Sequence, residues 1–379
     1  MNNFADLGVN ARIAAALAAR DIRAPVAVQA QAIPALLRGR DVVLEAPTGS
    51  GKTLAFVLPM LECLQPGRRA PQALIVAPTR ELAIQIASVL RGVEPKIRSA
   101  LLYGGVPYGR QTNELRARPD IVIGTPGRTL DMVERGLLQL GGVDYLVLDE
   151  ADEMLDAGFA RDVERIIGLT GRRQTVLASA TMPPWVGTMI RKHLQEPARV
   201  RVQDQAASTL ESGLLHVADS ERFETLHRLL KGQDGPIIVF GRTKHGVKKL
   251  SKRLAALGHS TGELQGNLSQ NRRAATMDGF RRGRIRVLVA TNVAARGIDV
   301  EDVALVVNYE LPESAQWLTH RVGRTARQGA AGRALTILAP QDEAAWRKLR
   351  RQGAPNIQSL DRVHLLDHGQ WRHVTRSRP

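Results

Sequence analysis

The stretch LEAPTGSGKT, residues 44–53, begins as the end of an apolar strand, continues through a glycine-rich loop and runs into a helix that starts near Lys52. A strand, a loop with Gly49 and Gly51, and a helix in this order are typical of phosphate-binding loops in α/β proteins. The glycines let backbone N–H groups surround an oxyanion, and the helix N-terminus adds its positive dipole end. A plain glycine turn with an exposed lysine is the alternative, and the flanking strand and helix argue against it.

The chemistry of this loop predicts a bound nucleotide with its metal ion. Lys52 is expected to reach the terminal phosphates, and the Thr53 hydroxyl can bind Mg²⁺. Ala46 stands where such loops usually have their first glycine, a change that leaves the backbone geometry of the later glycines intact. The residues expected to contact the phosphates are Thr48, Gly49, Ser50, Gly51, Lys52 and Thr53.

A second stretch, YLVLDEAD at residues 145–152, places four apolar residues directly before clustered carboxylates. Such an apolar run reads as a strand buried on both faces, and like charges this close together are costly unless a cation accompanies them. In a parallel α/β sheet, ligands bind beyond the carboxyl ends of the strands. We therefore expect Asp149 to hold the metal ion and Glu150 to orient or deprotonate an attacking water. Taken alone, the acids could instead form a solvated loop.

Short apolar runs recur between helical patterns along the whole chain, which predicts parallel sheets covered by helices on both faces. The rhythm occurs twice, so two similar lobes are expected. The first series comprises residues 41–46, 73–78, 121–125, 145–150 and 175–181, and the second comprises residues 236–241, 286–291, 304–309 and 333–339. Between them, residues 201–213 lose this periodicity and become polar, which indicates a linker.

Charge is the unusual feature of the composition. The 379 residues include 53 Lys and Arg against 37 Asp and Glu, a net charge of +16 that favours a polyanionic partner such as nucleic acid. The excess is uneven, because residues 1–205 hold 25 basic and 21 acidic side chains, whereas residues 206–379 hold 28 and 16. The second half is therefore the more probable electrostatic platform.

The remaining composition argues for a chain that stays in a reducing compartment. Cys63 is the only cysteine, so no disulfide can form within the chain, and we interpret it as structural. The N-terminal residues 1–22 have the pattern of an amphipathic helix and lack the features of a signal peptide. No apolar run reaches the roughly 18 residues of a membrane span. We expect a cytoplasmic location without membrane association.

An ordered series of motifs resembles the DEAD-box family of ATP-dependent RNA helicases, within helicase superfamily 2. The resemblance covers roughly residues 4 to 340, and the order and spacing of the motifs make it specific. The motifs are Phe4 with APVAVQ (24–29), APTGSGKT (46–53), PTRELA (78–83), GG (104–105), TPGR (125–128), DEAD (149–152), SAT (179–181), VFGRT (239–243), QNRR (270–273), ATNVAARGID (290–299) and HRVGRTARQG (320–329).

The resemblance implies an α/β fold with two RecA-like domains in tandem, each a mainly parallel sheet with helices on both faces. The expected divisions are an ATP-binding domain at residues 1–202, a linker at 203–212, a helicase domain at 213–352 and a basic, partly disordered tail at 353–379. It implies RNA-stimulated ATP hydrolysis, coupled to closure of the two lobes and to local, non-processive unwinding of short duplexes or remodelling of RNA–protein complexes.

The resemblance also implies roles around the ATP. Gln29 reads the adenine edge, Phe4 stacks on the ring and Asp299 contacts the ribose. Arg324 and Arg327 act as arginine fingers on the γ-phosphate, in catalysis with Lys52, Asp149 and Glu150. The residues that couple hydrolysis to closure are Asp152, Ser179, Thr181 and His320.

The same resemblance implies contacts with the RNA backbone, and hence little sequence specificity. A protein partner is not specified. The expected RNA contacts are Arg80, Gly105, Thr125 and Arg128 in the first lobe and Arg242, Thr243, Arg273 and Thr291 in the second.

The sequence departs from the family pattern at several positions without losing a catalytic group. Val26 replaces the usual Thr beside Gln29, Asn292 replaces an Asp and thereby loses its ionic contacts, and Ala326 replaces a Gly. Two rival functions are a DNA helicase or translocase of the same superfamily and an RNA clamp that binds ATP without turnover. The DEAD motif with the upstream Gln29 argues against the first, and the intact Lys52, Glu150, Arg324 and Arg327 argue against the second.

Overall fold

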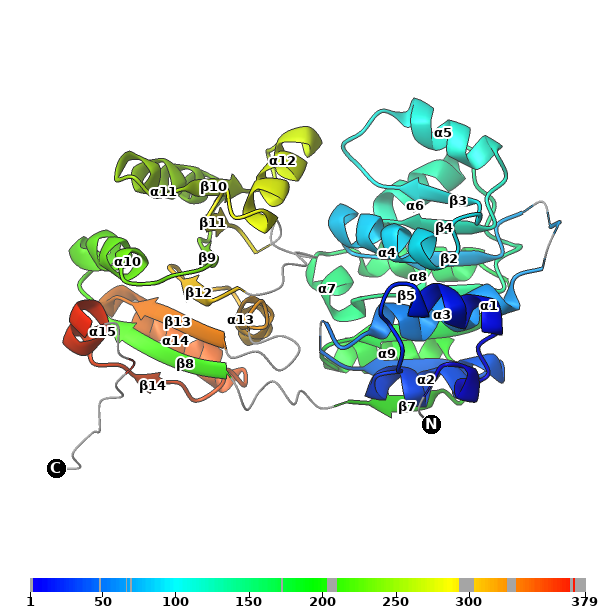
Figure 1. Ribbon diagram of the computed structural model, residues 1–379, viewed down its shortest axis with the longest axis horizontal. Helices are drawn as coiled ribbons and strands as arrows, with labels where there is room; N and C mark the ends of the chain where they lie inside the picture. Colours follow the sequence, from blue (N-terminus) through cyan, green and yellow to red (C-terminus); the bar gives the residue numbers. More distant parts are fainter. Residues whose placement is uncertain are drawn as a thin grey trace. The chain divides into compact units, whose positions relative to one another are not determined.

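The computed structural model describes residues 3–47, 49–65, 67–68, 70–171, 173–202, 210–292, 303–325, 332–368 and 371. The chain divides into two compact units, Met1–Asp204 and Gln205–Pro379. Each unit consists of a parallel sheet with helices on both of its faces, as the sequence predicts (Figure 1). The prediction of two tandem α/β domains, each with a mainly parallel sheet, is thereby confirmed.

The sheet of the first unit has seven strands, and all its described strand pairs are parallel. Their spatial order is β3 (Ser99–Leu102), β4 (Ile121–Gly124), β2 (Ala73–Val76), β5 (Tyr145–Leu148), β6 (Gln174–Ser179), β1 (Val42–Glu45) and β7 (Ala198–Arg201). One face packs against α2 (Ala27–Leu37), α3 (Lys52–Cys63) and α4 (Arg80–Val93). The other face packs against α5 (Tyr108–Arg116), α6 (Pro126–Glu134), α7 (Ala151–Asp156), α8 (Ala160–Leu169) and α9 (Pro184–His193).

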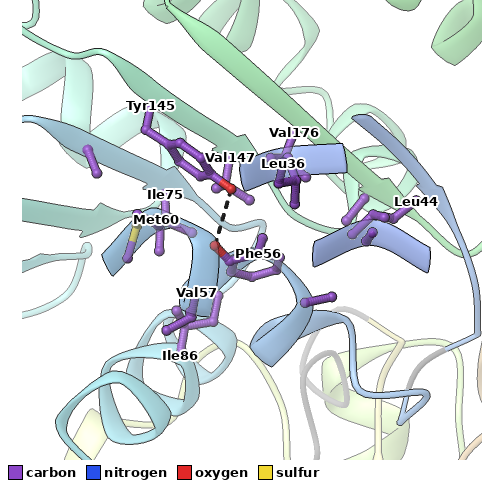
Figure 2. Packing of buried hydrophobic residues seen from close by; sticks show 14 of the residues in the cluster. Leu36, Leu44, Phe56, Val57, Met60, Ile75, Ile86, Tyr145, Val147 and Val176 are labelled. Atoms are coloured by element: carbon purple, nitrogen blue, oxygen red, sulfur yellow. Dashed lines mark hydrogen bonds between the residues drawn. The ribbon is translucent and has the colours of Figure 1, made fainter. Parts of the chain in front are cut away.

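Strands β2, β4 and β5 of this sheet carry no polar side chain other than the Tyr145 hydroxyl, because both of their faces are buried. Phe56 of α3 packs at the centre of the cluster between the sheet and its helices (Figure 2). The Tyr145 hydroxyl donates a hydrogen bond of 3.2 Å to the Phe56 carbonyl oxygen, which gives this buried polar group a partner. The packing fixes α3, and with it the loop that precedes α3.

The N-terminal segment covers the outer side of α2 and α3. It contains η1 (Ala5–Leu7) and α1 (Ala11–Ala18), the amphipathic helix that the sequence predicts. Asn10 caps α1 by accepting a hydrogen bond of 2.9 Å from the Ile13 N–H, and Ile13 and Leu17 face the core. Phe4 belongs to the same apolar cluster and is only 2% exposed.

The second unit repeats this architecture. Its parallel strands follow the spatial order β10 (Thr261–Leu264), β11 (Val287–Ala290), β9 (Ile237–Phe240), β12 (Leu305–Asn308), β13 (Gly332–Leu338), β8 (Leu210–His216) and β14 (Gln358–Ser359). On one face lie α10 (Arg222–Lys231), α11 (Lys244–Ala256) and α15 (Arg362–His368). On the other lie α12 (Gln270–Arg281), α13 (Ala315–Val322) and α14 (Glu343–Arg351), and the single turns η3 (Asp219–Glu221) and η4 (Pro340–Asp342) precede α10 and α14.

Two predicted boundaries differ from the structure. The last residues of the expected linker, 210–212, belong to β8, because this polar segment is held by a parallel ladder to β13. Residues 203–209 lie outside the described residues. Part of the expected tail is ordered as β14 and α15, since Leu360 is buried against β8, where a Cβ atom at Gly213 would lie 2.2 Å from the Leu360 side chain. No helix in the described ranges has the length and apolar character needed to cross a membrane.

The packing around Phe56 predicts which strands lose stability when the Phe56 side chain is replaced by a smaller one. Phe56→Ala should lower the free energy of unfolding of the first unit by about 3–5 kcal/mol, because it removes a fully buried ring from a close-packed cluster. Hydrogen exchange of strand peptides, read by mass spectrometry, measures the loss of protection. We expect it in β1, β2, β5 and β6.

The matched variant Phe280→Ala removes an equally buried ring from the second unit. It should lower protection in β9 and β11 and leave the first unit unchanged. Equal loss of protection in both units from either variant would show that the two cores do not act separately.

Candidate functional site

The glycine-rich loop joins β1 to α3, and α3 begins at Lys52. Gly49 and Gly51 have φ angles of 84° and 91°, a left-handed conformation that residues with side chains rarely adopt. A Cβ atom at Gly51 would also lie 2.7 Å from the Nε2 atom of Gln29. Both backbone geometry and packing therefore require glycine there. Thr48, which is expected to contact the phosphates, lies outside the described residues.

The loop presents donors that suit an anion. The first N–H groups of α3 have no acceptor within the helix, and the helix dipole places partial positive charge at this end. The buried hydroxyl oxygen of Ser50 has no hydrogen-bond partner among the residues described. A phosphate group with several oxygen acceptors would satisfy these donors. The side chain of Thr53 follows on the first turn of α3 and is partly exposed.

The ammonium group of Lys52 supplies the positive charge of the site. Its buried ammonium donates hydrogen bonds of 2.5 Å to the Ala46 carbonyl oxygen and 2.8 Å to the Pro47 carbonyl oxygen. Burial lowers the pKa of Lys52, and neighbouring carboxylates oppose this shift. Those carboxylates belong to Asp149, Glu150, Asp152 and Glu153. The structure thus brings together the two stretches that the sequence singles out, the loop before α3 and the acids after β5.

The two acids at the end of β5 are both buried. Burial, together with the charge of Glu150, raises the pKa of Asp149 to about 7, although Lys52 acts to lower it. Glu150 has φ 49° and ψ 52°, a left-handed conformation that is uncommon for a residue with a side chain. Its N–H donates a 3.0 Å hydrogen bond to Asp149 Oδ1. Four carboxylates lie around the single ammonium of Lys52, so an additional cation fits here.

The donor set matches Mg²⁺. Asp149 offers a carboxylate and Thr53 a hydroxyl, and hard oxygen ligands of this kind suit Mg²⁺. Among the residues described, no group of three or more His, Cys, Asp or Glu side chains could hold a metal ion. Proteins that use Mg²⁺ with nucleotides usually supply one or two carboxylates, and the phosphates and water complete the coordination. The residues present therefore fit a Mg²⁺ ion that binds together with a nucleotide.

Asp152 is joined to the loop after β6. Its Oδ2 atom accepts hydrogen bonds from the Thr181 N–H at 2.9 Å and from the Thr181 hydroxyl at 2.6 Å. The Ser179 hydroxyl donates to the Thr181 carbonyl oxygen at 2.7 Å, and Asp152 N donates to Ser179 Oγ at 3.4 Å. Three of the residues expected to couple hydrolysis to closure therefore form one network. The fourth, His320, lies on α13 of the second unit, with its ring 6.0 Å from that of Trp317.

Of the residues expected to recognise adenine, Gln29 lies on the first turn of α2 and Phe4 precedes η1. Gln29 donates a 3.1 Å hydrogen bond from Nε2 to the Gly51 carbonyl oxygen and accepts one of 3.0 Å from the Val26 N–H. Gln29 therefore connects the start of α2 to the phosphate-binding loop. Phe4 is instead packed in the apolar cluster under α1, so its stacking on adenine stays a prediction. Asp299 lies outside the described residues.

Two expected RNA contacts of the first unit touch one another. The guanidinium of Arg80, at the start of α4, lies against Gly105, where a Cβ atom would come within 2.4 Å of it. Gly105 also has φ 82°, so both packing and backbone favour glycine. Thr125 is the N-cap residue of α6, and Arg128 lies on the first turn of that helix. All four positions are at the carboxyl ends of β2, β3 and β4.

In the second unit the expected RNA contacts follow β9, β10 and β11. The N–H of Arg242 donates a 2.6 Å hydrogen bond to Glu310, and Thr243 caps α11 by accepting a bond from the Gly246 N–H. Arg273 lies on α12, and Thr291 follows β11. Arg324 follows α13 and donates from Nε to the His320 carbonyl oxygen at 3.1 Å. Arg327 lies outside the described residues.

The sequence reasoning missed the buried side chain of Arg321. Its guanidinium donates to Asn292 Oδ1 at 2.6 Å, to the Glu310 carbonyl oxygen at 2.6 Å and to Asn308 Oδ1 at 3.1 Å. Burial lowers its pKa to about 9, against the charges of Glu310 and Glu313. Asn292, identified as a departure that loses ionic contacts, still binds Arg321 as a neutral acceptor. The position of Arg321 directly before an apolar residue in a helical pattern was the available signal.

Two family models match the chain. One is described as DEAD/DEAH box helicase and matches residues 26–189, and the other is described as Helicase conserved C-terminal domain and matches residues 221–329. The first contains the glycine-rich loop, both acids and the Ser179–Thr181 segment. The second contains α10 to α13. The two models thus fall within separate units of the structure.

Curated proteins of known name are similar over most of the chain. The DEAD-box ATP-dependent RNA helicase CshA of Geobacillus kaustophilus is 38% identical over 371 residues, which cover 94% of this chain and 79% of CshA. The ATP-dependent RNA helicase DeaD of Escherichia coli K12 is 42% identical over 355 residues, which cover 92% of this chain and 56% of DeaD. The aligned part therefore spans little more than half of DeaD.

Solved structures show the same fold. Dbp5 of Saccharomyces cerevisiae, bound to RNA and ADP BeF3, superposes with a TM-score of 0.86 at 30% identity, covering 97% of this chain and 98% of that chain. Mss116p bound to single-stranded RNA and AMP-PNP superposes with a TM-score of 0.84 at 27% identity, covering 93% of this chain and 77% of that chain.

The network around Asp152 predicts a difference between two substitutions of Thr181. Thr181→Val removes the hydroxyl donor from a buried carboxylate, which should destabilise the first unit by about 1.5–3 kcal/mol. Thr181→Ser keeps the hydroxyl and should cost less. Urea unfolding, monitored by circular dichroism, compares the two with the unsubstituted protein. Equal midpoints for both variants would contradict a stabilising role of the hydroxyl.

Proposed function

The chain belongs to the DEAD/DEAH box helicase family, and we propose that it is an ATP-dependent RNA helicase in which RNA-stimulated ATP hydrolysis drives local, non-processive separation of short duplexes or remodelling of RNA–protein complexes. One observation of this structure supports the proposal most directly. The loop of Gly49, Gly51 and Lys52 and the buried acids Asp149 and Glu150 meet at one edge of one sheet. Phosphate-binding donors and a metal-binding carboxylate are the parts that phosphoryl transfer requires.

ATP binding begins with an exchange of partners at Lys52. In the structure its ammonium is held by the carbonyl oxygens of Ala46 and Pro47. The β- and γ-phosphates are stronger acceptors because they are charged, so Lys52 turns to them when ATP enters. The N–H groups at the start of α3 and the Ser50 hydroxyl complete the phosphate contacts.

Thr53 and Asp149 are the residues that would hold Mg²⁺ together with the nucleotide. When bound, Mg²⁺ neutralises charge that develops on the phosphate oxygens. Glu150 is the neighbouring carboxylate, and it orients the attacking water or accepts its proton. The left-handed backbone of Glu150 sets the direction in which its side chain leaves the strand, so the strained conformation belongs to the catalytic geometry.

The adenosine part of ATP is recognised by three residues. Gln29 pairs with the adenine edge, since an amide carries both the donor and the acceptor that adenine requires. Phe4 stacks on the ring and Asp299 binds the ribose. Because Gln29 also donates to the Gly51 carbonyl oxygen, adenine recognition is connected directly to the phosphate-binding loop.

RNA and ATP favour the same closed state of the two units, so each promotes binding of the other. Arg324 and Arg327 then stabilise charge on the γ-phosphate, a contribution of about 10³ to 10⁵ in rate for arginine fingers of other NTPases. Asp152, Thr181 and His320 transmit closure to the chemistry, with Ser179 supporting them. Of these contacts, the hydrogen bonds of Asp152 with Ser179 and Thr181 are the ones already formed in the first unit.

RNA is bound through its phosphates and sugars by residues of both units, which explains low sequence specificity. The larger basic excess of residues 206–379 adds an attraction that weakens with salt. The contact residues proposed are Arg80, Gly105, Thr125, Arg128, Arg242, Thr243, Arg273 and Thr291. The cytoplasmic location stays a prediction.

ATP turnover with different nucleic acids tests this function. With Mg²⁺ and saturating ATP, single-stranded RNA should raise the steady-state rate well above the rate without nucleic acid, and DNA of the same sequence should raise it far less. EDTA should abolish turnover if a metal ion is required. Equal stimulation by DNA and RNA would favour the rival DNA helicase or translocase, and no turnover with any nucleic acid would favour the non-catalytic clamp.

The variant Glu150→Gln tests the role of Glu150 in the same assay. It keeps the size and shape of the side chain and removes its negative charge and its ability to accept a proton, so ATP should still bind while turnover falls by about 10² or more, as for loss of a general base. Equilibrium binding of a fluorescent ATP analogue reports the first property. Undiminished turnover in Glu150→Gln would exclude Glu150 from the reaction.

A further inference from the structure

The loop between β3 and α5 is held at its start by the buried side chain of Gln111 and at its end by Arg128, to which Gln111 is hydrogen-bonded. Gln111 of α5 is 2% exposed, and its Nε2 atom donates a 3.0 Å hydrogen bond to the Tyr103 carbonyl oxygen at the start of the loop. Gln111 Oε1 accepts a 3.1 Å bond from Arg128. Arg128 in turn donates to the Val106 carbonyl oxygen at 3.4 Å, at the end of the loop. Gly104 and Gly105 lie between the two anchored carbonyls.

Arg128 itself is fixed by an aromatic contact. Its guanidinium carbon lies 4.4 Å from the centre of the Tyr108 ring, and that of Arg135 lies 4.2 Å from the same ring. Asp131 links the group, because it accepts a 2.8 Å hydrogen bond from Arg135 Nε and lies 3.6 Å from Arg128 Nε. One cation–π contact and one ion pair, together with the hydrogen bonds to Gln111 and Val106, leave the Arg128 guanidinium little freedom.

The anchored loop lies where the proposed RNA contacts of the first unit gather. Gly105 is in contact with the Arg80 guanidinium, and Arg128 reaches the loop from α6. Two consecutive glycines expose backbone N–H groups that can approach phosphate oxygens closely, provided that the loop keeps one conformation. A glycine loop is otherwise costly to order, since glycine loses the most backbone entropy.

We propose that Gln111 is a positioning residue for RNA binding: it holds the Gly104–Gly105 loop in the conformation that receives the RNA backbone. This inference rests on the proposed function. The Gln111 amide supplies both the donor that the Tyr103 carbonyl oxygen requires and the acceptor that the Arg128 guanidinium requires. Gln111 acts through the loop and through Arg128 and does not itself contact RNA, because its side chain is buried.

Other contacts hold α5 in place without Gln111. Leu115 packs into the core, and Glu114 accepts a 3.0 Å hydrogen bond from the Leu101 N–H of β3. Substitution of Gln111 should therefore release the loop and leave the helix folded. The chain also offers a matched control, Gln72, which is 3% exposed and directly precedes β2, at the amino-terminal ends of the strands of the same sheet. Its side-chain amide makes two hydrogen bonds to the backbone of Gln65.

The test is the RNA concentration that gives half-maximal stimulation of ATP turnover. Gln111→Leu should raise it about tenfold through loss of two buried hydrogen bonds that order the loop, while turnover at saturating RNA stays close to that of the unsubstituted protein. Gln72→Leu removes an equally buried amide and should leave the half-saturation unchanged. Thermal unfolding of both variants shows that each is folded at the assay temperature.

Gln111→Glu separates the two bonds of the side chain. Its carboxylate keeps an acceptor for Arg128 but opposes an oxygen to the Tyr103 carbonyl oxygen, so it should also raise the half-saturation. A half-saturation equal to that of Gln72→Leu in either Gln111 variant overturns the inference and leaves the proposed function standing. Absence of RNA stimulation in the unsubstituted protein overturns the proposed function, and the inference with it.

Discussion

A buried ammonium group among carboxylates is the interaction on which the first unit depends. Lys52, Asp149 and Glu150 are all buried, and burial of any one of them as an isolated charge would cost much free energy. Each is tolerated because the others lie close by, and the parallel sheet brings them together by ending β1 and β5 at the same edge. The carboxylates still exceed the cation, because four of them lie around the one ammonium. The site is therefore prepared for a cation and for the phosphates that accompany it.

The central strands of both units could be predicted from the sequence, because burial on both faces makes them continuous apolar runs. The strands β1, β2, β5 and β9 fall within the predicted ranges. The edge strands β3, β7, β10 and β14 were not predicted. Their residues are buried only on one side or not at all. β7, β10 and β14 therefore lack an apolar run and are defined by hydrogen bonds to a neighbour.

Sequence motifs identify most of the residues that form the site, but they do not give the arrangement of those residues in space. Gly51, Lys52, Asp149 and Asp152 are recognisable because their chemistry dictates their spacing in the sequence. The hydrogen bonds of Lys52 to the Ala46 and Pro47 carbonyl oxygens could not be predicted, because sequence patterns do not give the positions of backbone atoms. Arg321 and Gln111 were missed for a related reason. Each is a polar side chain whose partners lie on other elements, and polar residues in helical patterns normally face solvent.

Binding of nucleotide by Lys52→Met tests the central claim most directly. Methionine has similar length and no charge, so it removes the cation and preserves much of the packing. If Lys52 exchanges its carbonyl partners for the terminal phosphates, affinity for the unhydrolysed analogue AMP-PNP with Mg²⁺, measured by isothermal titration calorimetry, falls by about 100-fold. Affinity for adenosine, which has no phosphates, stays unchanged. Equal affinity of both proteins for AMP-PNP would contradict the account.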